Sequence, residues 1–131
     1  MVKFLVDTNV VIDQLRGIPK AHSFLLANKH FISHTTIAEL IHGTKNKDDL
    51  KTVSRIVSTL EVIPIRDMHS ETAISLMDEF FLSHHLEFMD ALIAATAIEE
   101  DLTLVTSNTK HFSFIKGLKL EDWEKVKVSG V

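Results

Sequence analysis

Three carboxylates that stand far apart in the chain, Asp7, Glu39 and Asp90, are the residues best suited to chemistry in this sequence. Each lies beside an apolar segment, and no Lys or Arg stands within one helical turn of Glu39. If folding brings the three side chains together, their charges repel one another. A hard divalent cation, Mg²⁺ or Mn²⁺, is the simplest neutraliser of such an all-oxygen site. A cation of this kind acidifies a bound water and stabilises charge on a phosphoryl group, so these residues predict metal-dependent hydrolysis of a phosphodiester.

The elements that must position these residues follow from the pattern of apolar residues. Short apolar segments predict strands at 3–6, 31–33, 62–63 and 102–106. Helical patterns are found at 10–15, 21–27, from Thr35 or Thr36 to Gly43, and at 48–60, 69–85 and 89–99. We expect the tail at 118–126 to add an edge strand or to pack as a loop. The alternation predicts an α/β fold, a three-layer α/β/α sandwich with a short parallel sheet of four to five strands.

Such a sheet brings distant residues together at one edge, because ligands bind beyond the carboxyl ends of parallel strands. Asp7 ends the first strand, and Glu39 lies in the first turn or so after the second. Asp90 opens a helix that runs antiparallel to the strand after it, so it reaches the same edge. Polar side chains that follow the strands are expected there as well: Thr35, Thr36, Thr106, Ser107 and Asn108.

Each carboxylate also has a structural interpretation. Asp7 suits the cap of the helix that follows it equally well, since Asp is among the best N-cap residues. Asp90 suits the first turn of a helix, where the helix dipole favours negative charge. Glu39 is different, because it stands between Ala38 and Leu40 in a segment that we expect to be buried, where an unpaired carboxylate is costly.

Length and composition narrow the classes of protein. A chain of 131 residues predicts a single domain over 1–131. Lys and Arg number 14 against 18 Asp and Glu, and the net charge of −4 excludes binding of nucleic acid by bulk charge alone. The absence of Cys excludes a thiolate metal centre and a cysteine nucleophile. No signal peptide or membrane span is recognisable, so we expect a cytoplasmic protein without a membrane partner.

Four segments of the chain resemble, in order and spacing, the motif blocks of the PIN domain. They are LVDTNVVID at 5–13, TTIAELIHG at 35–43, FMDALIAATA at 88–97 and LVTSNTKHF at 104–112. The resemblance covers essentially the whole chain and is closest to the VapC-like ribonuclease toxins of prokaryotic toxin–antitoxin pairs. It implies a PIN-like nuclease domain that cleaves RNA endonucleolytically with Mg²⁺ or Mn²⁺. It also implies a cognate VapB-like antitoxin, whose C-terminal segment covers the active-site groove, and a homodimer.

The resemblance also implies roles for particular residues. Asp7, Glu39 and Asp90 would be the metal-binding carboxylates, with Asn108 beside them in the catalytic set. The polar residues expected to support the carboxylates or to position substrate are Thr8, Asn9, Thr36, Thr106 and Ser107.

The chain departs from the family pattern after the fourth strand. The family places another acidic residue there, and this chain has Asn108 and His111 at the two positions where it is usually found. An amide oxygen still coordinates a metal, but one negative charge is missing, which leaves the binding of a second ion open. Glu87, one helical turn before Asp90, is a possible substitute. Asp101 precedes the fourth strand and belongs to the opposite edge.

A basic stripe and a histidine pair are further candidate sites. Lys47, Lys51 and Arg55 recur every four residues, which is usually a solvated helix face but beside an acidic site would hold RNA phosphates. His30 and His34 have a spacing seen in zinc sites, yet they lie on a strand and its exit, so their side chains need not converge. His42 and His111 lie within reach of the site, with structural roles favoured for both.

Other functions remain open at this point. A PIN-domain nuclease that processes RNA and is not a toxin, and a catalytically weak PIN-fold binding module, both share the fold. A more remote alternative is a phosphatase or phosphoryl acceptor built on Asp7. Such phosphatases require a second Asp two residues later, where this chain has Asn9, and phosphoryl acceptors require a Lys after a late strand, which is missing.

Overall fold

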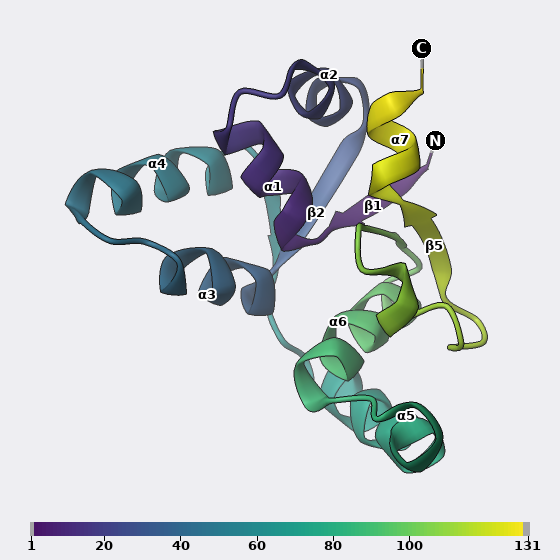
Figure 1. The fold of residues 1–131 in the computed structure, drawn as a ribbon. Coiled ribbons are helices and arrows are strands. Elements are labelled where there is room, and N and C mark those ends of the chain that lie inside the picture. The colour runs from purple at the N-terminus through teal and green to yellow at the C-terminus, as the bar shows by residue number, and fades with distance from the viewer. Residues whose placement is uncertain (1, 130–131) are drawn as a thin grey trace.

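A computed structural model describes residues 2–129 and contains one parallel sheet of five strands in the order β3-β2-β1-β4-β5 (Figure 1). All neighbouring strands pair in parallel. The strands are β1 (Lys3–Val6), β2 (Lys29–Ser33), β3 (Glu61–Ile63), β4 (Thr103–Thr106) and β5 (Lys119–Asp122). The expected parallel sheet of four to five strands is confirmed, with the fifth strand at the edge.

Alternation along the strands builds a separate core on each face of the sheet. Leu5 and Leu104 point into one core, while the next residues, Val6 and Val105, point into the other. All four side chains are at most 1% exposed, as strands covered on both faces require.

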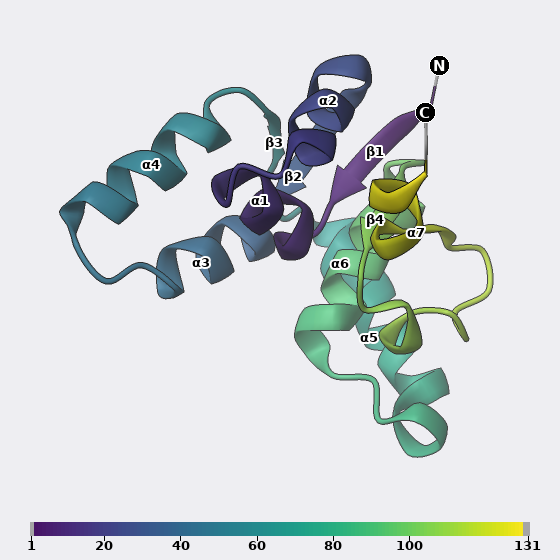
Figure 2. The same cartoon turned by 45° about the horizontal axis from the view of Figure 1, so that its top comes forward.

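Within residues 2–129 seven helices cover the two faces of the sheet, which confirms the three-layer architecture (Figure 2). The first core is closed by α5 (Asp67–His84) and α6 (Phe88–Glu99), which lie together below the sheet in Figure 1. The helices that contribute to the second core are α1 (Thr8–Leu15), α2 (Pro19–Ala27), α3 (His34–His42), α4 (Lys47–Val57) and α7 (Trp123–Val128). A 3-10 turn, η1 (Thr109–His111), follows β4.

Two details of the expected elements are wrong. The cap of α3 is Ser33, whose hydroxyl accepts from the Thr36 backbone N–H, and not Thr35 or Thr36. The tail forms β5 and then a helix, so the loop interpretation fails beyond Asp122. Trp123 makes the difference, because its fully buried ring anchors α7 in the second core.

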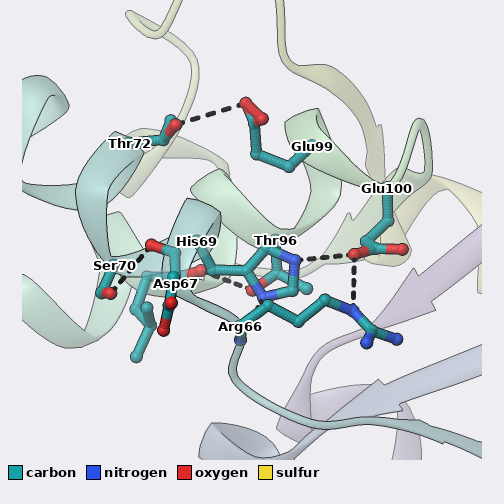
Figure 3. A network of polar contacts seen from close by, with 9 residues as sticks. Arg66, Asp67, His69, Ser70, Thr72, Thr96, Glu99 and Glu100 are labelled. Carbon is teal, nitrogen blue, oxygen red and sulfur yellow. Dashed lines mark hydrogen bonds and ion pairs between the residues drawn. The ribbon is translucent and has the colours of Figure 1, made fainter.

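A polar network holds the far end of α6 against the start of α5 (Figure 3). His69 is fully buried; its Nδ1 accepts from the Arg66 backbone N–H at 3.1 Å, and its Nε2 donates to Glu100 Oε2 at 2.8 Å. The Arg66 guanidinium binds the same carboxylate oxygen at 3.2 Å. α6 is apolar on all sides from Ala91 to Ala95 and is buried there. The network and this burial together fix the helix that carries Asp90.

Within residues 2–129, no helix combines the length and the apolar character needed to cross a membrane.

Candidate active site

Asp7 lies at the centre of the carboxyl edge, between the ends of β1 and β4. The strand order changes direction here, because β2 lies on one side of β1 and β4 on the other, and such switch points bind ligands in open parallel sheets. The Asp7 carboxylate accepts from the Thr8 backbone N–H at 2.8 Å and from Thr106 Oγ1 at 2.7 Å. Asp7 is 5% exposed and caps α1. Asp7 therefore both caps α1 and lies at the carboxyl edge of the sheet, so its structural and functional interpretations are compatible.

Glu39 reaches the same edge from α3, where its Oε2 accepts from Thr8 Oγ1 at 3.2 Å. The prediction that Glu39 is buried is wrong, since the residue is exposed on α3, as is its neighbour Ala38. Successive residues of a helix lie about 100° apart, so Leu40 packs into the core without burying Glu39. Partial desolvation nevertheless raises the pKa of Glu39, the charges of Asp7 and Asp90 raise it further, and the Thr8 hydrogen bond opposes them.

Asp90 enters from the first turn of α6 and is half-buried. Its Oδ2 lies 3.1 Å from His111 Nδ1, on the 3-10 turn after β4. Burial raises the pKa of Asp90, and the charges of Asp7 and Glu87 add to that rise, whereas the charge and hydrogen bond of His111 lower it. The net direction is upward, so this carboxylate ionises less readily than a free one.

The three carboxylates are close enough for their charges to act on one another, because Asp7 raises the pKa of both of the others. In the part of the chain that the structure describes, Asp7 and Glu39 form no ion pair, and Asp90 pairs only with His111. As the side chains stand in residues 2–129, no three Asp, Glu or His residues are grouped closely enough to hold a metal ion. The site is thus a concentration of negative charge with little to neutralise it.

Several of the predicted supporting residues contact the carboxylates or the loop beside them. Thr8 bonds to both Asp7 and Glu39, and the fully buried Thr106 bonds to Asp7. Asn9 Oδ1 accepts from the Ser107 backbone N–H at 2.9 Å, which ties the start of α1 to the loop after β4. These contacts fix Asp7 and that loop relative to each other.

The side chains of Thr36 and Asn108, unlike those of Thr8 and Thr106, make no hydrogen bond to the three carboxylates in the described residues. Thr36 is buried and makes its hydrogen bonds with Ser33 in the cap of α3. Asn108 is exposed; its backbone N–H donates to Thr106 Oγ1 at 3.0 Å. Roles for these two side chains at the carboxylates stay predictions.

The basic stripe of Lys47, Lys51 and Arg55 is exposed on α4. By helical geometry it lies on the opposite side of α4 from Val53 and Asp49, which line a cleft of about 310 Å³ shared with Thr8 and Glu39. The described structure therefore gives the stripe no contact with the acidic edge, and its role in holding RNA phosphates stays a prediction.

Sequence reasoning underestimated two residues near the site. The sequence favours a structural role for His111, yet it is the side chain that contacts Asp90. Its only sequence signal was its place in the block after the fourth strand. Glu124 on α7 carries no sequence signal for the site, and its Oε2 accepts from Ser107 Oγ at 2.6 Å. That contact depends on the docking of α7, which no local pattern predicts.

His30 and His34, the candidate zinc ligands, do not form a metal site in the described residues. His30 is buried beside Phe4 and Phe24, where its Nε2 lies 2.7 Å from the Phe24 carbonyl, and His34 is exposed. Among residues 2–129 no metal-holding group of side chains includes either.

Comparison with known proteins agrees with the fold. Residues 4–117 match the PIN domain family. Ribonuclease VapC10 of Mycobacterium tuberculosis is 34% identical over 120 residues, which are 88% of this chain and 90% of the relative. A toxin–antitoxin complex from Klebsiella pneumoniae contains a chain with 34% identity and a TM-score of 0.73, covering 87% of this chain and 93% of that one. The structure of VapBC2 from Rickettsia felis bound to a promoter DNA fragment contains a chain with 28% identity and a TM-score of 0.83. The match covers 93% of this chain and 99% of that one.

The family match includes Asp7, Glu39 and Asp90 and the sheet as far as β4. The relative from M. tuberculosis and the structure from R. felis extend the similarity over most of the chain. This chain therefore belongs to the PIN-domain family and, within that family, to the relatives of VapC.

Proposed function

We propose that this chain is a VapC-type ribonuclease, the toxin of a toxin–antitoxin pair, which hydrolyses RNA phosphodiesters at the acidic edge with Mg²⁺ or Mn²⁺. The observation that carries the proposal is the convergence of Asp7, Glu39 and Asp90 from three separate elements onto the switch point of the sheet. The names of the relatives, a ribonuclease and a toxin–antitoxin complex, support the activity and the partner. Membership of the PIN family argues against the Asp-based phosphatase.

The carboxylates suit a divalent cation in kind and in charge. They supply oxygen atoms, which hard cations prefer, and their mutual repulsion would be relieved by positive charge. Because no three of them surround one point as they stand, their side chains would have to draw together to share an ion. When bound, such an ion acidifies a water and stabilises negative charge on the phosphoryl group. Asp7, Glu39 and Asp90 are the residues that would hold it.

The chain's own contacts explain how the site keeps its shape. Two hydrogen bonds hold the Asp7 carboxylate, one from the Thr8 backbone and one from Thr106. Thr8 Oγ1 holds Glu39, and His111 holds Asp90. Each carboxylate therefore has only neutral or imidazole partners and retains lone pairs for further contacts.

The direct test is cleavage of single-stranded RNA by purified protein with Mg²⁺ or Mn²⁺. We expect cleavage that stops in excess EDTA and in Asp90→Asn, while the circular dichroism spectrum of the variant stays that of the folded protein. A matched control is Asp78→Asn, an exposed carboxylate on α5, which should cleave like the wild type. Undiminished cleavage in EDTA by pure protein would refute the proposal.

The toxin role has its own test. Expression of the wild-type chain should slow growth of the host, Asp90→Asn should not, and co-expression with a small protein encoded beside it should relieve the effect. A wild type that is harmless in cells but cleaves RNA in vitro would instead indicate a nuclease of RNA processing. The homodimer expected from the resemblance stays a prediction.

A further inference from the structure

A second cleft, of about 310 Å³, adjoins the acidic site on the side of α6 and the 3-10 turn. It is lined by residues from the end of α5, the start of α6 and the segment after β4: His84, His85, Leu86, Glu87, Asp90, Lys110, His111 and Phe114. Asp90 belongs both to this lining and to the acidic site, and its carboxylate is hydrogen-bonded to the His111 ring. A molecule in this cleft would therefore lie directly beside Asp90, one of the three carboxylates of the acidic site.

One wall of the cleft is a flat aromatic surface. The rings of His84 and Phe114 are stacked, with centroids 4.0 Å apart and planes 10° apart. Phe80 packs edge-on against Phe114 at 5.2 Å, and Ser83 Oγ lies 2.7 Å from His84 Nδ1. Phe114 is half-buried while His84 is exposed, so the outer ring rests on an inner ring that is itself supported.

An unpaired cation stands at the same cleft. Lys110 is exposed on the 3-10 turn, next to His111, and forms no hydrogen bond or ion pair within residues 2–129. An ammonium group with no partner, placed at the same cleft as Asp90, whose ion pair in the described residues is with the His111 imidazole, is free to bind an anion from outside. Strong repulsion between Asp90 and a nearby phosphate would otherwise disfavour a nucleic acid at this edge.

The character of the lining favours a polar ligand. An apolar ligand is poorly matched, because most of the lining residues are charged or imidazole side chains. A flat ring and a free cation side by side match a nucleotide, which has a planar base and an anionic phosphate.

We propose that this cleft binds the nucleotide next to the cleaved bond of an RNA strand, with Lys110 on a phosphate and the base stacked on His84 backed by Phe114. The inference rests on the proposed ribonuclease function and adds a binding subsite to it. Proteins that bind single strands combine these two features, since every base has a face that stacks on an aromatic ring. Lys110 and His84 are binding residues here and take no part in the reaction itself.

The test is binding of a fluorescent 2′-O-methyl RNA oligonucleotide in EDTA, measured by anisotropy over a range of salt concentrations. Lys110→Gln should weaken binding and lower the slope of log affinity against log salt by about 0.7, the value for one phosphate contact on a single strand. His84→Ala should weaken binding by roughly fivefold to a hundredfold with the slope unchanged, as loss of one stacked base predicts. A 2-aminopurine base in the probe should be quenched by the wild type and less by His84→Ala.

Lys116→Gln is the matched control, because Lys116 is exposed a few residues beyond Lys110 and does not line the cleft. It should bind RNA like the wild type. Equal losses in Lys110→Gln and Lys116→Gln would indicate unspecific attraction and overturn the subsite, as would wild-type affinity in both Lys110→Gln and His84→Ala. Cleavage assays separate the two proposals. A wild type that binds RNA but never cleaves it with Mg²⁺ or Mn²⁺ contradicts the proposed function. A wild type that cleaves RNA, while both cleft variants bind RNA normally, contradicts only the subsite.

Discussion

Asp7 and Glu39 show how one hydroxyl residue organises two repelling charges. Thr8 donates its backbone N–H to Asp7 and its side-chain hydroxyl to Glu39, so the two carboxylates are held at one point of the sheet edge. Neither hydrogen bond neutralises a charge. The arrangement is costly without a cation and becomes favourable when one binds, since a ligand that binds only the folded protein stabilises it.

Glu39→Gln tests this cost. In EDTA the variant should melt at the same temperature as the wild type or up to about 5 °C higher, because it loses a like charge worth less than about 1 kcal/mol at an exposed position and keeps an acceptor for Thr8. With Mn²⁺ the wild type should gain about 2.7 kcal/mol at a hundredfold excess over Kd, and the variant much less. Thermal melts with and without metal measure both effects.

Glu79→Gln is the control, as Glu79 is exposed on α5 away from the site, and it should respond to metal like the wild type. A Glu39→Gln protein that is clearly less stable than the wild type in EDTA would argue against a strained acidic cluster.

α7 illustrates how an element far along the chain completes the structure near the site. Asp13 on α1 accepts from Trp123 Nε1 at 2.8 Å and from Lys127 Nζ at 3.0 Å. Burial tends to raise the pKa of Asp13, but these two hydrogen bonds and the charges of Lys127 and Arg16 outweigh burial and lower it. The ionised Asp13 therefore ties α7 to α1.

This lowered pKa predicts a pH dependence of stability. A carboxyl whose folded pKa lies below its ordinary value, 3.8 for Asp13, contributes stability above that value and loses it as the pH falls through the folded pKa. Asp13→Asn should therefore cost about 1–3 kcal/mol at pH 7 and progressively less below about pH 4. Urea unfolding at a series of pH values measures the difference. Asp78→Asn, at an exposed site on α5, should show a small difference at every pH; a constant penalty for Asp13→Asn would mean that its charge does not matter.

The pair of α5 and α6 depends on the network of Figure 3. His69→Ala should destabilise the protein by about 2–4 kcal/mol, because it removes a fully buried ring and leaves the Arg66 N–H and the Glu100 carboxylate without that partner. Glu100→Gln should cost less, since its amide oxygen still accepts. Chemical denaturation compares the variants.

Glu99→Gln provides the matched control at the last residue of α6, directly before Glu100, where an exposed hydrogen bond of 3.2 Å joins Glu99 to Thr72. We expect a change within about 0.5 kcal/mol. Equal effects of His69→Ala and Glu99→Gln would show that the network adds little to the packing of α5 on α6.

The whole molecule is organised around one sheet whose two faces serve two cores. Neighbouring residues of β1, Leu5 and Val6, belong to different cores. Unfolding of either core would therefore expose one of these two buried side chains of β1. The acidic edge is formed by elements from both faces, with α1 and α3 on one and α6 on the other. A chain with a net charge of −4 thus carries its proposed RNA contacts as local features at that edge.

Such an arrangement predicts a single cooperative unfolding transition. Trp123 is the only Trp and lies in the second core, so its fluorescence reports that face, whereas far-ultraviolet circular dichroism includes α5 and α6 on the other face. The two signals should give the same midpoint, and Mn²⁺ should move both equally. Two separate midpoints would show that the faces unfold independently.

The sequence by itself determined the order and type of nearly all elements and the residues with the capacity for chemistry. Short apolar segments such as that ending at Asp7 and the all-apolar helix after Asp90 have local patterns strong enough to identify them. Their alternation then determined a parallel sheet, and the rule that ligands bind at the carboxyl edge predicted that Asp7, Glu39 and Asp90 lie close together, as their mutual charge effects bear out.

Only the tertiary structure decided which side chains are exposed, which distant side chains contact each other, and what structure the tail at 118–126 adopts. Glu39 has apolar neighbours in sequence, but its exposure depends on which side of α3 packs against the core. The contact of His111 with Asp90, and the docking of α7 through Trp123 and Asp13, join residues 21 and 110 positions apart. Local propensity contains no term for such distant pairs, because their energy comes from packing, desolvation and charge that exist only once the chain has folded.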